Sequence, residues 1–136
     1  MKTKILLVLF AAGALWSAQP AQAHHAFAAE YDEKKPVTLT GTVTKMQWVN
    51  PHGWMSMDVK QPDGKVKHWT IETSGPSQLS RRGLKKADFT DGMSAVVKGY
   101  QGLKDPAFAN GRTLVLADGR SFYIGSVGGP NDGADR

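Results

Sequence analysis

Apolar and polar residues alternate most clearly in residues 37–44, where Val37, Leu39, Gly41 and Val43 are separated by threonines. A period of two residues is typical of a β-strand with one buried face. Gly41 lies in the middle of this pattern, and a glycine inside a strand indicates a tight bend or a close backbone approach. We therefore expect a long, bent first strand, as in small barrels.

Two further alternating segments follow, each bounded by turn signals. Residues 50–53 (Asn-Pro-His-Gly) predict a turn, and residues 61–64 (Gln-Pro-Asp-Gly) predict a hairpin between strands in residues 54–60 and 65–73. The side chains expected to point inward are Met55, Met57, Val59, Trp69 and Ile71. On the third strand, His68, Thr70 and Glu72 are expected on the opposite face.

The hydrophobic period changes after the third strand. Gly75-Pro76 ends the strand, and the sequence predicts a short helix that begins near Ser77 and ends at Gly83. Residues 101–112 have the composition of a polar loop. The remaining predicted strands are residues 93–100, 113–119 and 121–125.

This order of elements predicts a mainly β fold. Three meandering strands, one short helix and two or three more strands are typical of a small OB-like Greek-key β-barrel with five or six strands. The short helix lies between strands 3 and 4 in that arrangement. A half-open barrel or a sandwich of six strands is the alternative.

The N-terminal residues have the pattern of a secretory signal peptide. Lys2 and Lys4 precede an apolar run, and Ala21-Gln22-Ala23 has the small residues that signal peptidase accepts. We expect cleavage after Ala23, export and a periplasmic location. The predicted organisation is a cleaved signal peptide in residues 1–23, an arm in 24–36, the barrel domain in 37–125 and a disordered tail in 126–136.

Composition excludes several classes of function. The formal net charge is +5 and the chain has no cysteine, so disulfides, thiol nucleophiles and iron–sulfur ligation are excluded. No nucleotide-binding motif and no spacing typical of a hydrolase is present. We expect neither an enzyme nor a nucleic-acid-binding protein.

A His-His pair opens the predicted mature chain. With cleavage after Ala23, the free amine and imidazole of His24 could chelate one metal ion, and His25 and His52 offer further nitrogens. A nitrogen-rich site of this kind suits Cu(II) better than Zn(II). His68 and the Met55 thioether are additional candidates. The alternative is that the pair only begins a flexible arm.

The Asn-Pro-His turn lies between two tryptophans. Trp48, His52 and Trp54 could line the mouth of a ligand site, because aromatic rings beside an imidazole offer both stacking and cation–π contacts. Alternatively, the tryptophans only cover the end of the barrel. A basic run, comprising Arg81, Arg82, Lys85 and Lys86, could make a weak contact with a membrane surface, or it could be a solvated face.

Most of the mature chain resembles a family of small exported bacterial proteins of unknown function. The matching stretches are AHHAFAAEYD, KPVTLTGTVTKMQWVNPHGWMSMDV, GPSQLSRRGLKKADFTDGMSAVVKGY and NGRTLVLADGRSF. The Asn-Pro-His turn and the Arg-Arg-Gly helix end are its most specific motifs. Family members usually follow His-His with serine, whereas this chain has Ala26. The resemblance implies a periplasmic protein with an OB-like barrel and implies no activity.

Two functional interpretations follow. The first is a non-catalytic periplasmic binding or accessory protein, whose ligand or partner is a small molecule or another periplasmic protein. The second is a copper-binding or copper-trafficking protein that uses His24, His25 and His52.

Overall fold

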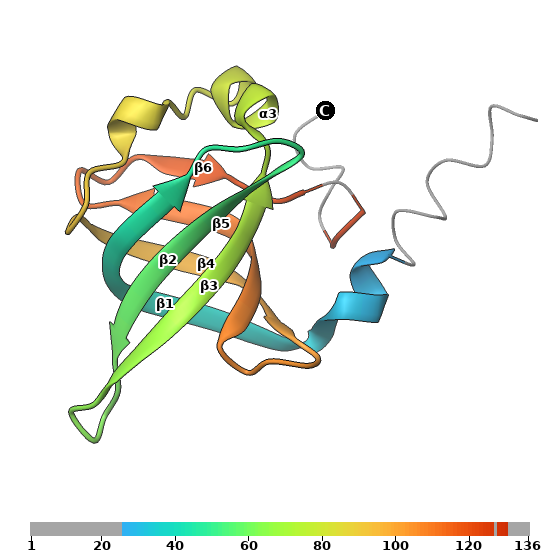
Figure 1. Cartoon of the computed structure of the whole chain (residues 1–136), viewed down its shortest axis with the longest axis vertical. Helices are drawn as coiled ribbons and strands as arrows, with labels where there is room; N and C mark the ends of the chain where they lie inside the picture. Colours follow the sequence, from blue (N-terminus) through green and yellow to red (C-terminus); the bar gives the residue numbers. More distant parts are fainter. Residues whose placement is uncertain (1–25, 127, 131–136) are drawn as a thin grey trace, which may run out of the picture.

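The computed structural model describes residues 26–126 and 128–130, and this part of the chain is mainly β, as predicted (Figure 1). A short helix over residues 26–30 precedes the first strand. The strands are β1 (Tyr31–Gln47), β2 (His52–Lys60), β3 (Val66–Ser74), β4 (Ser94–Gly102), β5 (Phe108–Leu116) and β6 (Ser121–Tyr123). Between β3 and β4 lie the α-helix α3 (Pro76–Arg81) and the 3-10 helix η1 (Lys86–Asp88).

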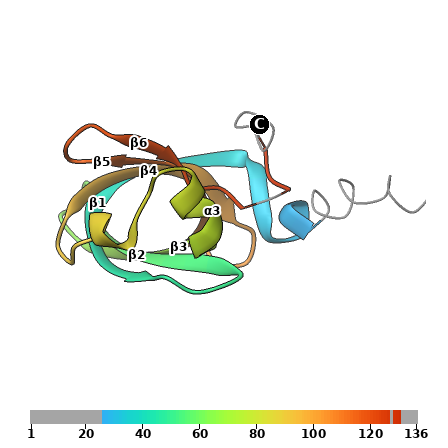
Figure 2. The ribbon, with the colours of Figure 1, turned by 90° about the horizontal axis from the view of Figure 1, so that it is seen from above.

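The strands form one sheet in the order β3-β2-β1-β4-β5-β6, and β3 also pairs with β5. The β3–β5 pairing is parallel, whereas the pairings of consecutive strands in that order are antiparallel. Hydrogen bonds therefore run in a circuit through β1, β2, β3, β5 and β4. Figure 2 shows α3 lying across one end of these strands.

Strand β1 is curved, as predicted, and it changes its pairing partner along its length (Figure 1). Its residues up to Thr42 pair with β4, and those from Thr42 onward pair with β2. A Cβ atom added at Gly41 would lie 2.2 Å from the backbone oxygen of Asp58. The predicted close backbone approach at Gly41 is confirmed.

The hydrophobic core lies on the predicted face of the strands. The five residues expected to point inward are all buried, and Leu79 and Leu84 add to them from the connection between β3 and β4. The methionines of β2 are core residues, since Met55 and Met57 are 0% exposed.

The helical connection differs from the prediction of one helix from Ser77 to Gly83. α3 begins at Pro76, because proline lacks an N–H and has the φ angle of a first helical turn. Gly83, with φ of +86°, follows the end of the helix, and η1 is an additional helical turn. The helix over residues 26–30 was also not predicted.

In three segments that the sequence predicts to be irregular, some of the described residues belong to strands or are buried. Residues 31–36, expected in an arm, belong to β1, and residues 108–112, expected in a polar loop, belong to β5. Residues 31–36 pair with β4, and residues 108–112 pair with β4 and β3. These pairings stabilise the strands although no local sequence pattern predicts them. In the predicted tail, Ser126 and Gly129 are buried.

Candidate functional site

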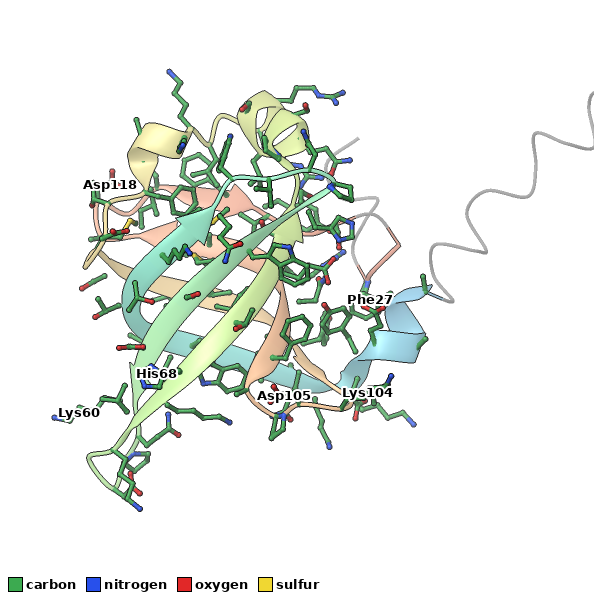
Figure 3. The ribbon with its side chains drawn as sticks, viewed as in Figure 1. Phe27, Lys60, His68, Lys104, Asp105 and Asp118 are labelled. Carbon is green, nitrogen blue, oxygen red and sulfur yellow. The ribbon has the colours of Figure 1, made fainter. Side chains whose placement is uncertain are left out.

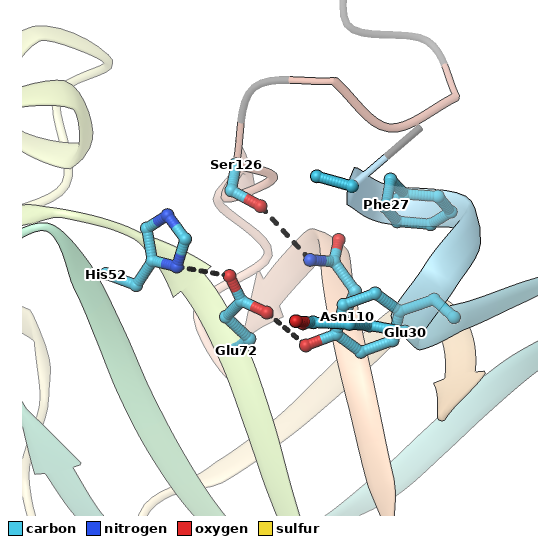
Figure 4. A pocket seen from close by; sticks show the side chains of 8 residues that line it. Phe27, Glu30, His52, Glu72, Asn110 and Ser126 are labelled. Atoms are coloured by element: carbon cyan, nitrogen blue, oxygen red, sulfur yellow. Dashed lines mark hydrogen bonds and ion pairs between the residues drawn. The ribbon is translucent and has the colours of Figure 1, made fainter. Parts of the chain in front are cut away.

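A pocket of about 260 Å³ lies where the helix over residues 26–30 meets the start of β2, the end of β3 and the start of β5 (Figure 4). Two aromatic side chains and several hydrogen-bonding groups face it. The lining residues are Ala26, Phe27, Glu30, Tyr31, His52, Glu72, Asn110 and Ser126.

Glu72 is the buried carboxylate of this pocket, with only 4% of its surface exposed. It lies near the end of β3, opposite Trp54 of β2 and Asn110 of β5. The hydroxyl of Tyr31 donates to one carboxylate oxygen, and Nδ1 of His52 contacts the other (Figure 4). These two partners compensate for the loss of water around the buried carboxylate.

His52 is held in one orientation at the mouth of the pocket. It begins β2 directly after Pro51, and its side chain is 43% exposed. The contact with Glu72 uses Nδ1. The second ring nitrogen, Nε2, takes no part in this contact and is the atom that His52 can offer to a ligand.

Tyr31 completes the chain of hydrogen bonds from the protein interior. Its ring lies 5.2 Å from that of Phe27 and 5.8 Å from that of Phe108, measured between centroids. Burial and the neighbouring Glu72 carboxylate raise the pKa of the Tyr31 hydroxyl. Tyr31 therefore stays neutral and remains a donor to Glu72 at all physiological pH values.

A second polar network forms the opposite wall. Asn110 is 1% exposed and donates to the hydroxyl of Ser126 at 3.1 Å. Arg112 donates to Oδ1 of Asn110 at 3.3 Å and to the backbone oxygen of Ser126 at 3.0 Å. Sequence reasoning missed Glu72, Asn110 and Arg112 as site residues. The polar composition of residues 101–112 gave no local signal of burial.

The three residues predicted to bind a ligand lie in different surroundings. His52 lines the pocket, whereas Trp48 packs against Phe89, with 5.9 Å between ring centroids. Trp54 stacks on Phe108 with centroids 5.7 Å apart. Neither tryptophan lines the pocket that contains His52.

Of the predicted metal ligands, His52 is described by the structure, and His24 and His25 lie outside the described residues. Within residues 26–126 and 128–130, no group of three His, Asp or Glu side chains is arranged to hold a metal ion. Met55 is fully buried in the core. His68 pairs with Asp58 at 2.5 Å and lies toward the β2–β3 turn, away from Phe27 (Figure 3).

The basic run is divided between two environments. Arg81, Lys85 and Lys86 are exposed, but Arg82 is half-buried and donates to the hydroxyl of Ser74 and the backbone oxygen of Gly125, each at 3.0 Å. Arg82 therefore has a structural role. Among the described residues, no helix has the length and apolar character needed to span a membrane.

Comparison with family models gives a match over residues 13–109, which is more than half of the chain. The chain belongs to DUF6152, a family of unknown function. The match covers the residues from β1 to the first residues of β5, including His52 and Glu72. No curated protein and no solved structure matches this chain.

Proposed function

We propose that this member of the family is an exported, non-catalytic binding protein whose ligand site is the pocket around His52, and that its ligand is a copper ion. The domain is proposed to be an OB-like barrel, for which the hydrogen-bonded circuit through β1, β2, β3, β5 and β4 is the support. We also propose that the protein is cleaved after Ala23 and is located in the periplasm.

The observation that carries this proposal is the pair of His52 and the buried Glu72 carboxylate. Histidines that bind metal ions usually give their other ring N–H to a carboxylate, a backbone carbonyl or water, which fixes the tautomer and raises the basicity of the ligand nitrogen. Here Glu72 takes that position and Tyr31 in turn holds Glu72. His52 is thus prepared to offer Nε2 without rearrangement.

The remaining ligands are proposed to come from the residues that precede Ala26 in the chain. Ala26 lines the same pocket as His52 and is covalently bonded to His25, and consecutive Cα atoms are about 3.8 Å apart. Cleavage after Ala23 would make His24 the N-terminus and add its free amine. A set made of one amine and up to three imidazoles favours Cu(II) among the divalent ions that an exported protein meets.

Titration with Cu(II), followed by calorimetry and electron paramagnetic resonance, tests the proposal on the processed protein. We expect one equivalent to bind with a nitrogen-rich spectrum, and we expect His52→Ala to weaken binding by about tenfold or more. His68→Ala is the matched control, because His68 also pairs with a carboxylate, that of Asp58, on the same two strands.

The two histidine variants separate a specific site from surface binding. Loss in His52→Ala with unchanged affinity in His68→Ala supports the pocket as the copper site. Equal affinity in both variants, or no binding at one equivalent to the wild-type protein, would refute it.

A further inference from the structure

Arg112 is a buried cation with neutral partners. It is 5% exposed, and within the described residues its terminal nitrogens donate to Oδ1 of Asn110, the hydroxyl of Tyr123, and the backbone oxygens of Ser126 and Pro130. Nε has no partner among these residues. Burying a guanidinium is unfavourable unless its donors are satisfied, so the structure must provide acceptors at fixed positions around it.

Two of those four acceptors, the backbone oxygens of Ser126 and Pro130, come from the segment after β6. This segment lies close to the guanidinium at two glycines, Gly125 and Gly129. A Cβ atom at Gly125 would lie 2.7 Å from Cζ of Arg112, and one at Gly129 would lie 2.4 Å from Nη1. A side chain at either position would therefore force the guanidinium or the surrounding backbone to shift.

The same arginine also contacts the other end of the described chain. Its Cζ lies 5.8 Å from the centroid of the Phe27 ring, within the range of a cation–π contact. Phe27 and Ser126 are both lining residues of the pocket that contains His52. One side chain thus touches the pocket wall formed by the N-terminal helix and the wall formed by the C-terminal segment.

We propose that Arg112 is the positioning residue of the pocket: it holds the N-terminal helix and the C-terminal segment against β5, so that Phe27 and Ser126 line the pocket that contains His52. Arg112 does not line this pocket and acts through Phe27, Asn110 and Ser126. Its effect on copper rests on the proposed function, whereas its effect on the two chain segments does not.

The variant Arg112→Met tests this role on the processed protein, because it removes every donor and nearly keeps the volume. We expect hydrogen exchange to rise in residues 26–31 and at residues 126, 128 and 129, while exchange in β2 and β3 stays as in the wild type. We expect Cu(II) affinity to fall by about tenfold and the paramagnetic resonance spectrum to change. Arg112→Lys, which keeps one charged donor group, should restore part of both properties.

Arg120→Lys is the matched control, since Arg120 is an exposed arginine that pairs with Asp118 and Asp88. It should leave exchange and copper binding unchanged. Should Arg112→Met fail to fold, Gly129→Ala keeps the arginine but puts a Cβ atom 2.4 Å from its Nη1, so that their contact must change. We expect this variant to give the same local increase in exchange.

The outcomes are distinguishable. Unchanged exchange at both chain ends in Arg112→Met, or in Gly129→Ala, would overturn the positioning role. A wild-type protein that binds no copper would refute the proposed function, and the exchange measurement would still decide the role of Arg112. Increased exchange with an unchanged copper spectrum would show that Arg112 does not position this site.

Discussion

At the scale of single residues, Glu72 determines what the pocket can do. A carboxylate that is 4% exposed needs partners for its oxygens, and Tyr31 and His52 fill that need from two different strands. The same contacts fix the imidazole of His52 at the pocket mouth. The exposed pair of His68 and Asp58 has similar chemistry but no buried anchor, so it lacks this constraint.

The pH dependence of stability tests the environment of Tyr31. Its pKa is raised above the ordinary value of 10.0 by burial and by Glu72. Above about pH 10 the unfolded chain therefore loses a proton that the folded chain keeps, and folding becomes less favourable as pH rises, by up to about 1.4 kcal/mol per pH unit. Below that pH this contribution is fully present.

Urea unfolding at about pH 9 and about pH 11 measures the effect. In Tyr31→Phe, the free energy of unfolding should fall less between these two pH values than in the wild type. Tyr100→Phe, a control on β4, should show the same fall as the wild type. If the free energy of unfolding falls equally with pH in the wild type and in Tyr31→Phe, then Tyr31 is not a buried hydrogen-bond donor with a raised pKa.

At the scale of elements, β1 joins the two halves of the sheet. It spans 17 residues and exchanges its partner from β4 to β2 around Thr42. The crossing brings β1 against the backbone of β2 at Gly41. Because Gly41 has no side chain, β1 can approach β2 this closely while it also pairs with β4.

Gly41→Val is therefore expected to destabilise the protein by about 1–3 kcal/mol, as overpacked sites do. The added Cβ would lie 2.2 Å from the backbone oxygen of Asp58, which cannot move without disturbing the β1–β2 pairing. Chemical denaturation measures the loss, and Thr40→Val, at an exposed position of the same strand, should be nearly neutral. Equal stability of the two variants would argue against the close approach.

At the scale of the whole molecule, the described ends of the chain meet at one pocket. The helix over residues 26–30 and the segment that includes Ser126 both line it, and His52 reaches it from β2 (Figure 4). The proposed copper site therefore depends on where the mature chain begins.

A processed protein that begins at His24 and one that carries two extra residues before His24 should differ in copper affinity. The extension moves the free amine away from the His24 imidazole, so we expect affinity to fall by about tenfold or more, as for loss of other parts of a metal site. Calorimetry on proteins of confirmed intact mass measures the difference. Equal affinities would exclude the terminal amine as a ligand.

Local sequence patterns determined the mainly β class, the inward faces of β2 and β3, and the close approach at Gly41. Each of these features depends on a period or a glycine that neighbouring residues make visible. The prediction of His52 as a site residue also came from its turn, and the structure places it in the pocket, while its ligand stays a prediction.

Only the tertiary structure decided the rest of the pocket. Asn110 and Arg112 look like loop residues, and Glu72 looks like the solvent face of a strand. Their burial comes from pairing between β3 and β5 and from the two chain segments that cover them. These contacts join residues far apart in the chain, and a buried polar residue is stable only with such partners. For that reason the sequence identified the imidazole, and the fold identified the carboxylate and the arginine around it.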